Sequence, residues 1–122
     1  MTKTIAGPAI AKGYPYRLRV SLAARVSGED PPALFPAGVA LRAQVRTTRA
    51  AAASVGELTT ANGGITRISD SVIEILLSAS ITNALVAGGT AHLDFARTDV
   101  APAEYVGLYL GIPVRQPVTV PA

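Results

Sequence analysis

Strict alternation of apolar and polar residues in two neighbouring segments limits what this chain can fold into more than any other feature. Within residues 71–99, two runs place every second residue on one apolar face, which is the pattern of half-buried sheet. Residues 80–86 between them have the length of a short helical turn that Ser80 can cap and Gly88-Gly89 can end. This pattern predicts a crossover unit of strand, helical turn and strand. The alternating apolar residues are Ile73, Ile75 and Leu77, followed by Ala91, Leu93 and Phe95.

The same period of two recurs elsewhere and predicts further strands over residues 16–22, 39–46 and 105–114. Residues 55–60 are expected to form a short strand without a clear alternation. Asn62-Gly63 is a strong hairpin signal and predicts a return strand that begins at Ile65. Pro113 lacks an N–H group, which predicts that the last strand lies at a sheet edge or ends there. Seven or eight short strands with one helical crossover predict an all-β protein, an immunoglobulin-like β-sandwich.

A chain of 122 residues is long enough for one domain with its own core. We expect the sandwich to occupy residues 16–122 and residues 1–15 to form an extended N-terminal arm, because Gly7-Pro8, Gly13 and Pro15 interrupt any helix or long strand there. The arm is either disordered or docked on a neighbouring subunit. The chain has no signal-peptide pattern and no apolar run of roughly 20 residues, which predicts assembly in the cytoplasm without a membrane partner.

Charge is divided unevenly along the chain. Residues 1–50 carry 8 − 2 = +6, and residues 51–122 carry 3 − 6 = −3. A basic face for nucleic acid is one interpretation, and pairing of the two halves across strands is the other. The arginines alternate with apolar residues and have no interleaved aromatic residues or lysine clusters, so we consider nucleic acid an unlikely partner.

Few residues suggest catalysis or metal binding. His92 is the only histidine, and Asp94 lies two positions along the same expected strand, so the pair faces the same way. Two side chains fall short of the three or four ligands that metals need, and no catalytic triad can be assembled. Because the chain also has no cysteine, we predict no catalytic, cofactor or metal site and no small-molecule substrate. We therefore expect that the protein is not an enzyme.

Exposed arginines and tyrosines, together with the apolar residues of the arm, are the best candidates for contacts with other proteins, because Tyr and Arg dominate interface energetics. The candidate interface residues are Ile5, Ile10, Tyr14, Tyr16, Arg17, Arg19, Arg42, Arg46, Tyr105 and Tyr109.

Four stretches in order carry a family resemblance. They read Val-Ala-Leu-Arg-Ala-Gln-Val-Arg at 39–46, Val-Ile-Glu-Ile-Leu-Leu-Ser-Ala-Ser-Ile-Thr-Asn-Ala-Leu at 72–85, Ala-Gly-Gly-Thr-Ala-His-Leu-Asp-Phe-Ala-Arg-Thr-Asp at 87–99, and Leu-Tyr-Leu-Gly-Ile-Pro-Val-Arg-Gln-Pro-Val-Thr at 108–119. The order resembles small β-sandwich virion proteins of tailed bacteriophages, including the N-terminal domain of phage baseplate upper proteins. Two details depart from that pattern: His92-Leu93-Asp94-Phe95 replaces a Tyr-Asp-Leu strand, and residues 100–104 replace an acidic-Gly hairpin.

The resemblance implies a structural component of a phage or phage-like particle. Such a protein docks on capsid or tail proteins and on copies of itself, as a capsid decoration protein, a head-fibre base or a baseplate component, and is located in the virion. The residues alone also allow an alternative function, an immunoglobulin-like module that binds a carbohydrate or a cell-surface protein.

Overall fold

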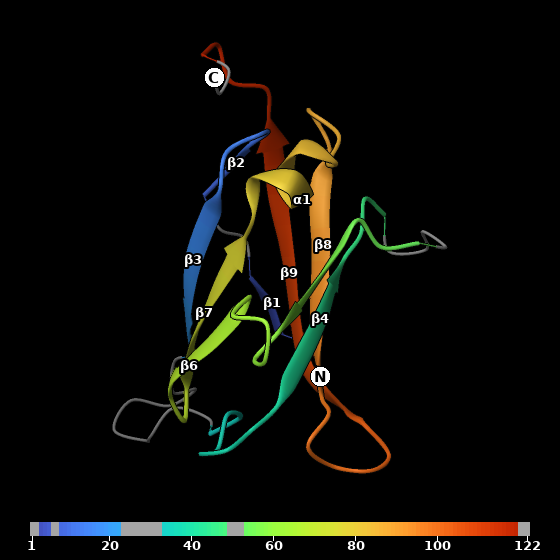
Figure 1. Cartoon of the computed structure of the whole chain (residues 1–122). Helices are drawn as coiled ribbons and strands as arrows, with labels where there is room; N and C mark the ends of the chain where they lie inside the picture. Colours follow the sequence, from blue (N-terminus) through green and yellow to red (C-terminus); the bar gives the residue numbers. More distant parts are fainter. Residues whose placement is uncertain (1–2, 6–7, 23–32, 49–52, 120–122) are drawn as a thin grey trace.

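The computed structural model describes residues 3–5, 8–22, 33–48 and 53–119. These residues form strands in two sheets and one short helix (Figure 1), which confirms the predicted all-β class. The elements are β1 (Lys3–Ile5), β2 (Ile10–Ala11), β3 (Tyr16–Ser21), β4 (Leu41–Val45), β5 (Gly56–Thr59), β6 (Ile65–Ser69), β7 (Val72–Leu77), α1 (Ala79–Asn83), β8 (Thr90–Arg97) and β9 (Glu104–Arg115).

The two sheets differ in size. The larger has six strands in the order β1-β9-β8-β4-β5, with β2 paired to β9 beyond the end of β1. The smaller has three strands in the order β3-β7-β6. All pairs are antiparallel except those of β1 and β2 with β9, which are parallel.

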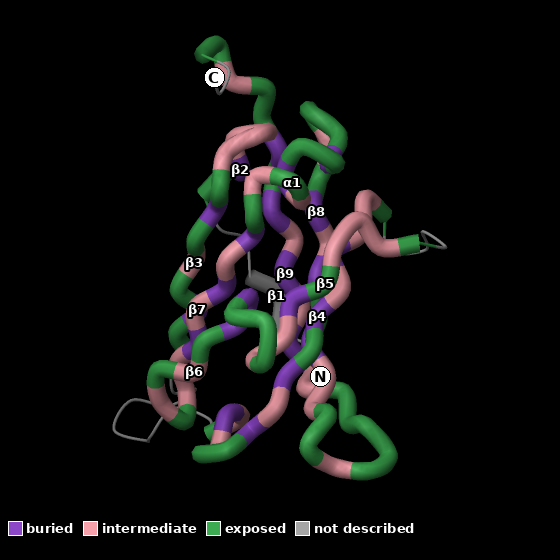
Figure 2. Tube along the Cα trace, in the orientation of Figure 1, coloured by how far each residue is buried: buried purple, intermediate pink, exposed green. Residues whose placement is uncertain are grey.

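The core lies between the two sheets, and the alternation seen in the sequence decides which residues enter it. Ile73, Ile75 and Leu77 of β7 are fully buried, while the residues between them are only half-buried. Leu93 and Phe95 of β8 face them from the larger sheet. Burying a side chain of this size contributes about 1.5–3 kcal/mol. Figure 2 shows the buried residues recurring along the strands of both sheets.

The predicted unit of strand, helical turn and strand is present as β7, α1 and β8. Its two strands belong to different sheets, so α1 carries the chain from one layer to the other. The N-cap is Ser78, whose side chain accepts a hydrogen bond from the Ile81 N–H. Ser80, the predicted cap, lies inside the helix, which begins earlier than the sequence pattern indicated. Gly88 has a φ of +83° in the turn before β8, as expected for a glycine there.

The first fifteen residues differ from the predicted arm. Lys3–Ile5 and Ile10–Ala11 are strands that pair with β9, and the Ile10 side chain is 0% exposed. Further contacts hold this segment to the sandwich: the Lys12 ammonium donates to the Leu85 carbonyl at 2.9 Å and the Tyr16 hydroxyl to the Pro8 carbonyl at 2.6 Å. The described part of residues 1–15 therefore belongs to the sandwich. A strand of two or three residues is too short for alternation to reveal it in the sequence.

Asn62-Gly63 does form a turn, with a φ of +82° at Gly63, but the turn does not close a hairpin. β5 pairs with β4 in the larger sheet, and β6 pairs with β7 in the smaller one. The chain crosses from one layer to the other here because Leu58 and Ile65, on either side of the turn, are both buried in the core between the sheets.

β9 is not an edge strand, although Pro113 predicted one. It lies between β8 and the short strands β1 and β2, and it continues to Arg115. The Val114 N–H donates to the Gly89 carbonyl on the β8 side, so the Pro113 nitrogen faces the other way. On that side β1 pairs no further than Leu110 and β2 begins its pairing at Val114. Pro113 therefore lies between the two partner strands, at a position where neither of them pairs and no backbone N–H is required.

Candidate functional site

A polar and aromatic surface covers the outer side of three strands of the larger sheet, β4, β8 and β9. We call it the large-sheet face. A hollow of about 530 Å³ lies over it. The outward side chains that line the hollow are Arg42 and Gln44 on β4, Arg46 directly after β4, His92, Asp94 and Ala96 on β8, and Tyr105 and Tyr109 on β9.

Strand register brings these residues together from distant parts of the sequence. Ala43 and Val45 point into the core, which turns Arg42, Gln44 and Arg46 outward. Pairing of β4 with β8 then sets Arg42 opposite Ala96, and a bridge sets Arg46 opposite His92. The face is therefore a direct consequence of period-two patterning in strands that happen to be neighbours.

A glycine makes room for the aromatic part of the face. Gly111 on β9 lies opposite His92, and a Cβ atom at that glycine would lie 3.2 Å from the Tyr109 hydroxyl. The Tyr109 ring therefore lies over Gly111 and reaches His92, with ring centroids 5.8 Å apart at an interplanar angle of 28°. The Tyr109 hydroxyl and His92 Nδ1 share a hydrogen bond. Tyr105, nearer the start of β9, is 56% exposed.

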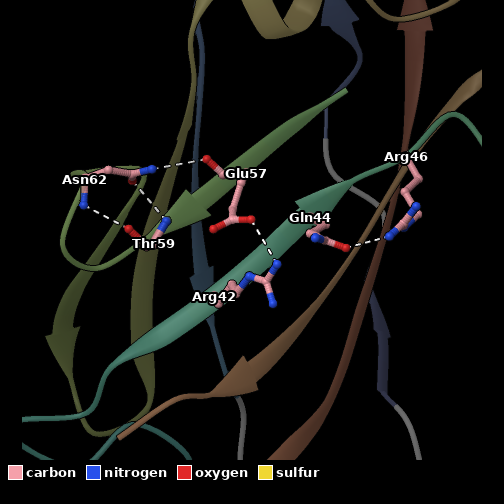
Figure 3. Close-up of polar contacts among 6 residues, drawn as sticks. All are labelled: Arg42, Gln44, Arg46, Glu57, Thr59 and Asn62. Atoms are coloured by element: carbon pink, nitrogen blue, oxygen red, sulfur yellow. Dashed lines mark hydrogen bonds and ion pairs between the residues drawn. The ribbon is translucent and has the colours of Figure 1, made fainter. Parts of the chain in front are cut away.

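Neighbouring side chains orient the cationic groups of the face (Figure 3). The Arg42 guanidinium donates through Nη2 to Oε2 of Glu57 on β5 at 3.1 Å. This hydrogen bond is the main cause of a lowered Glu57 pKa. Directly after β4, Arg46 Nη2 donates to Gln44 Oε1 at 2.5 Å. Both guanidinium groups are thus held along the strand by short contacts with adjacent residues.

The outer side of the smaller sheet is different in character, and we call it the small-sheet face. Glu74 lies at its centre and accepts from Arg17 at 2.5 Å and from Arg19 at 3.4 Å. The hydrogen bond from Arg17 is the largest cause of a lowered Glu74 pKa. Around this cluster three outward positions of β6 and β7 carry aliphatic residues, while Thr66 holds another outward position on β6. The three aliphatic residues are Ile68, Val72 and Leu76.

The predicted interface residues separate into three groups. Arg42, Arg46, Tyr105 and Tyr109 meet at the hollow of the large-sheet face. Arg17 and Arg19 lie on the small-sheet face, with side chains 63% and 59% exposed. The sequence also placed Gln44 outward beside Arg42 and Arg46, but it held no signal for Glu57, whose strand was short and weakly patterned.

The remaining candidates lie elsewhere. Ile10 and Tyr16 were predicted at an interface, but they are buried in the core at 0% and 9% exposure. Ile10 lies on a short strand that pairs with β9, and Tyr16 holds an inward position at the start of β3. Tyr14 donates its hydroxyl to the Thr119 carbonyl at 2.6 Å near the C-terminal end of the described chain. Ile5 is the last residue of β1, where it pairs with Leu110.

His92 and Asp94 occupy successive outward positions on β8, as predicted, and the partner of the His92 ring is Tyr109. Among residues 3–5, 8–22, 33–48 and 53–119, no three His, Cys, Asp or Glu side chains gather in a way that could hold a metal ion. Within the same ranges no helix has the length and apolar character to span a membrane.

Comparison with known protein families, with characterised proteins and with solved structures gives no match to this chain.

Proposed function

We propose that this chain is a non-enzymatic structural module of a tailed-phage or phage-like particle. Its sandwich docks on a capsid or tail protein of that particle through the small-sheet face. The family resemblance of residues 39–119 suggests the setting, and the composition of the face supports the docking.

The strand order supports an immunoglobulin-like sandwich as the scaffold. In such domains one sheet contains the last, the sixth and the third strands side by side, and the other contains the second, fifth and fourth. The orders β9-β8-β4-β5 and β3-β7-β6 follow the same plan on two conditions. The two N-terminal pieces, β1 and β2, are taken together as the first strand, and β5 counts as an added strand beside the third, as in variable-type domains. Both of these pieces pair with the last strand.

The observation that carries the docking proposal is the presence of aliphatic residues at outward positions of the smaller sheet. An antiparallel sheet with one solvated face normally alternates apolar residues inward with polar residues outward. Here Val72 and Leu76 hold outward positions on β7, and Ile68 on β6 is 44% exposed. Arg17 pairs across from Leu76 and offers both an aliphatic stem and a charged group. Apolar area and arginine are both enriched at the centres of protein interfaces.

The proposal predicts that the protein travels with particles. In lysates of the cells that make it, we expect the wild-type chain to sediment with assembled particles in a density gradient and to cross-link to a capsid or tail protein. The double variant Ile68→Asp, Leu76→Arg changes outward residues, so it should remain folded by circular dichroism. Because it places charge in the interface, it should stay at the top of the gradient.

The matched control is Thr90→Lys, which adds a charge at an exposed position of the larger sheet. It should sediment with particles as the wild type does. A wild-type chain that never enters the particle fraction would refute the proposed setting. Normal incorporation of the double variant would refute the small-sheet face as the docking surface.

A further inference from the structure

We infer that the hollow on the large-sheet face is a binding site for a neutral saccharide. This goes beyond the proposed docking function, because it concerns the opposite side of the sandwich. The site lies over β4, β8 and β9, while docking uses outward residues of β3, β6 and β7.

The shape of the hollow suits a small ligand that lies against a sheet. Its volume of about 530 Å³ is within the range of small-molecule sites, roughly 300–1,000 Å³. Ala96 is smaller than the other outward residues of β4 and β8, so the floor of the hollow is low beside Arg42. Tyr105 and Tyr109 contribute aromatic rings from β9, and Tyr109 is fixed in place by its contact with His92. A saccharide ring presents C–H groups on its faces, which pack against aromatic rings of this kind.

The polar groups suit the hydroxyl groups of a saccharide. Arg42 and Arg46 can only donate hydrogen bonds, the Asp94 carboxylate can only accept them, and the Gln44 amide does both. A hydroxyl group also donates and accepts, so neighbouring hydroxyls match a mixed array of this type. Arg42 is oriented by Glu57 and Arg46 by Gln44, so part of the ordering cost of binding is met before the ligand arrives.

Charge favours a neutral ligand. The guanidinium groups of Arg42 and Arg46 are matched in number by the carboxylates of Asp94 and Glu57. Asp94 is exposed on the central strand of the hollow, where it would repel an acidic peptide or an anionic sugar. A neutral saccharide avoids this repulsion and uses both signs of charge as hydrogen-bonding groups.

The test uses the full chain, labelled with ¹⁵N, and neutral disaccharides of hexoses, N-acetylhexosamines and deoxyhexoses as probes at up to about 10 mM. We expect at least one disaccharide to shift the amide resonances of β4, β8 and β9 without affecting those of β3 and β6. The variants Tyr105→Ala and Asp94→Asn change exposed side chains of the site. Each should weaken binding of that disaccharide by about tenfold or more in calorimetry.

The matched control is Arg17→Ala, an exposed arginine of the small-sheet face, which should bind the disaccharide as the wild type does. Absence of shifts with all probes would overturn the inference, and so would binding that Tyr105→Ala leaves unchanged. A hexaglutamate peptide that binds at the hollow in place of the sugars would overturn it in favour of an acidic protein segment. Tyr105→Ala should still sediment with particles, so failure of this inference is distinguishable from failure of the proposed docking.

Discussion

Asn62 and Thr59 hold each other through two hydrogen bonds at the end of an edge strand. The Thr59 N–H donates to Asn62 Oδ1 at 2.9 Å, and the Asn62 N–H donates to Thr59 Oγ1 at 2.9 Å. The same amide donates through Nδ2 to the Glu57 carbonyl at 3.2 Å (Figure 3). One side chain thus occupies backbone groups of β5 on the side away from β4. Open backbone groups on an edge strand invite pairing with another chain, so Asn62 protects this edge.

Replacement of this amide is predicted to weaken the fold and expose the edge. Asn62→Ala leaves the Thr59 N–H and the Glu57 carbonyl without their partner, and we expect it to lower the free energy of unfolding by about 1–2 kcal/mol. We also expect concentration-dependent self-association. Urea denaturation and light scattering measure the two effects. Asn62→Asp keeps the Oδ1 acceptor and loses the Nδ2 donor, so its stability should lie between those of the wild type and Asn62→Ala. A monodisperse Asn62→Ala protein of wild-type stability would contradict the protective role.

Acid is predicted to destabilise the protein partly through Asp99. Hydrogen bonds from the Arg97 guanidinium, at 3.2 and 2.7 Å, are the main cause that lowers the pKa of Asp99 from 3.8 to about 2. The folded state binds the Asp99 proton less readily than the unfolded state. The contribution of ionised Asp99 to the free energy of unfolding is therefore complete above about pH 4 and is lost as the pH falls toward 2. Asp99→Asn should therefore flatten the decline in stability over this interval.

Carboxyl chemical shifts from an NMR titration and urea unfolding at several acidic pH values measure these effects. Glu57 and Glu74 also have lowered pKa values and titrate in the same direction, so the flattening should be partial. An Asp99 midpoint near 3.8 in the folded protein would show that Arg97 does not act on this carboxyl group.

A buried hydroxyl joins α1 to the N-terminal segment, and its removal should be costly. Thr82 is 0% exposed, and its Oγ1 donates to the Tyr14 carbonyl at 2.8 Å and accepts from the Gly13 N–H at 3.2 Å. Thr82→Val keeps the shape and leaves both backbone groups without this partner, so we expect a loss of about 1–3 kcal/mol in denaturant unfolding. Thr82→Ser retains the hydroxyl and should lose less. Equal losses for the two variants would mean that packing, not hydrogen bonding, dominates at this position.

Deletion of residues 1–15 is predicted to destabilise the sandwich itself. The deletion removes the pairing of β1 and β2 with β9 and takes Ile10 out of the core. The single substitution Ile10→Ala should by itself cost about 2–5 kcal/mol, as for other fully buried aliphatic residues. Thermal unfolding of both proteins provides the measurement. A truncated chain that unfolds at the wild-type temperature would show that this segment is a dispensable arm after all, as the sequence pattern suggested.

The sequence by itself determined which side chains face inward. Ile73 and Ile75 enter the core and Arg42 faces outward because side-chain direction alternates along any extended strand, whatever lies beside it. This local rule was enough to predict an all-β protein, the strand–helix–strand unit and half of the outward residues that line the hollow. Arg42 on β4 and Arg46 just after it were recognised together with Tyr105 and Tyr109 on β9.

Only the tertiary structure decided which strands are neighbours. Backbone hydrogen bonds are chemically alike in every strand, so the residues of β5 and β6 did not reveal that the turn between them joins two different sheets. For the same reason β1 and β2 were not recognised as partners of β9. The contact of Tyr109 with His92 over Gly111 depends on the register of β8 against β9, which is set by packing of the whole core and not by any local pattern.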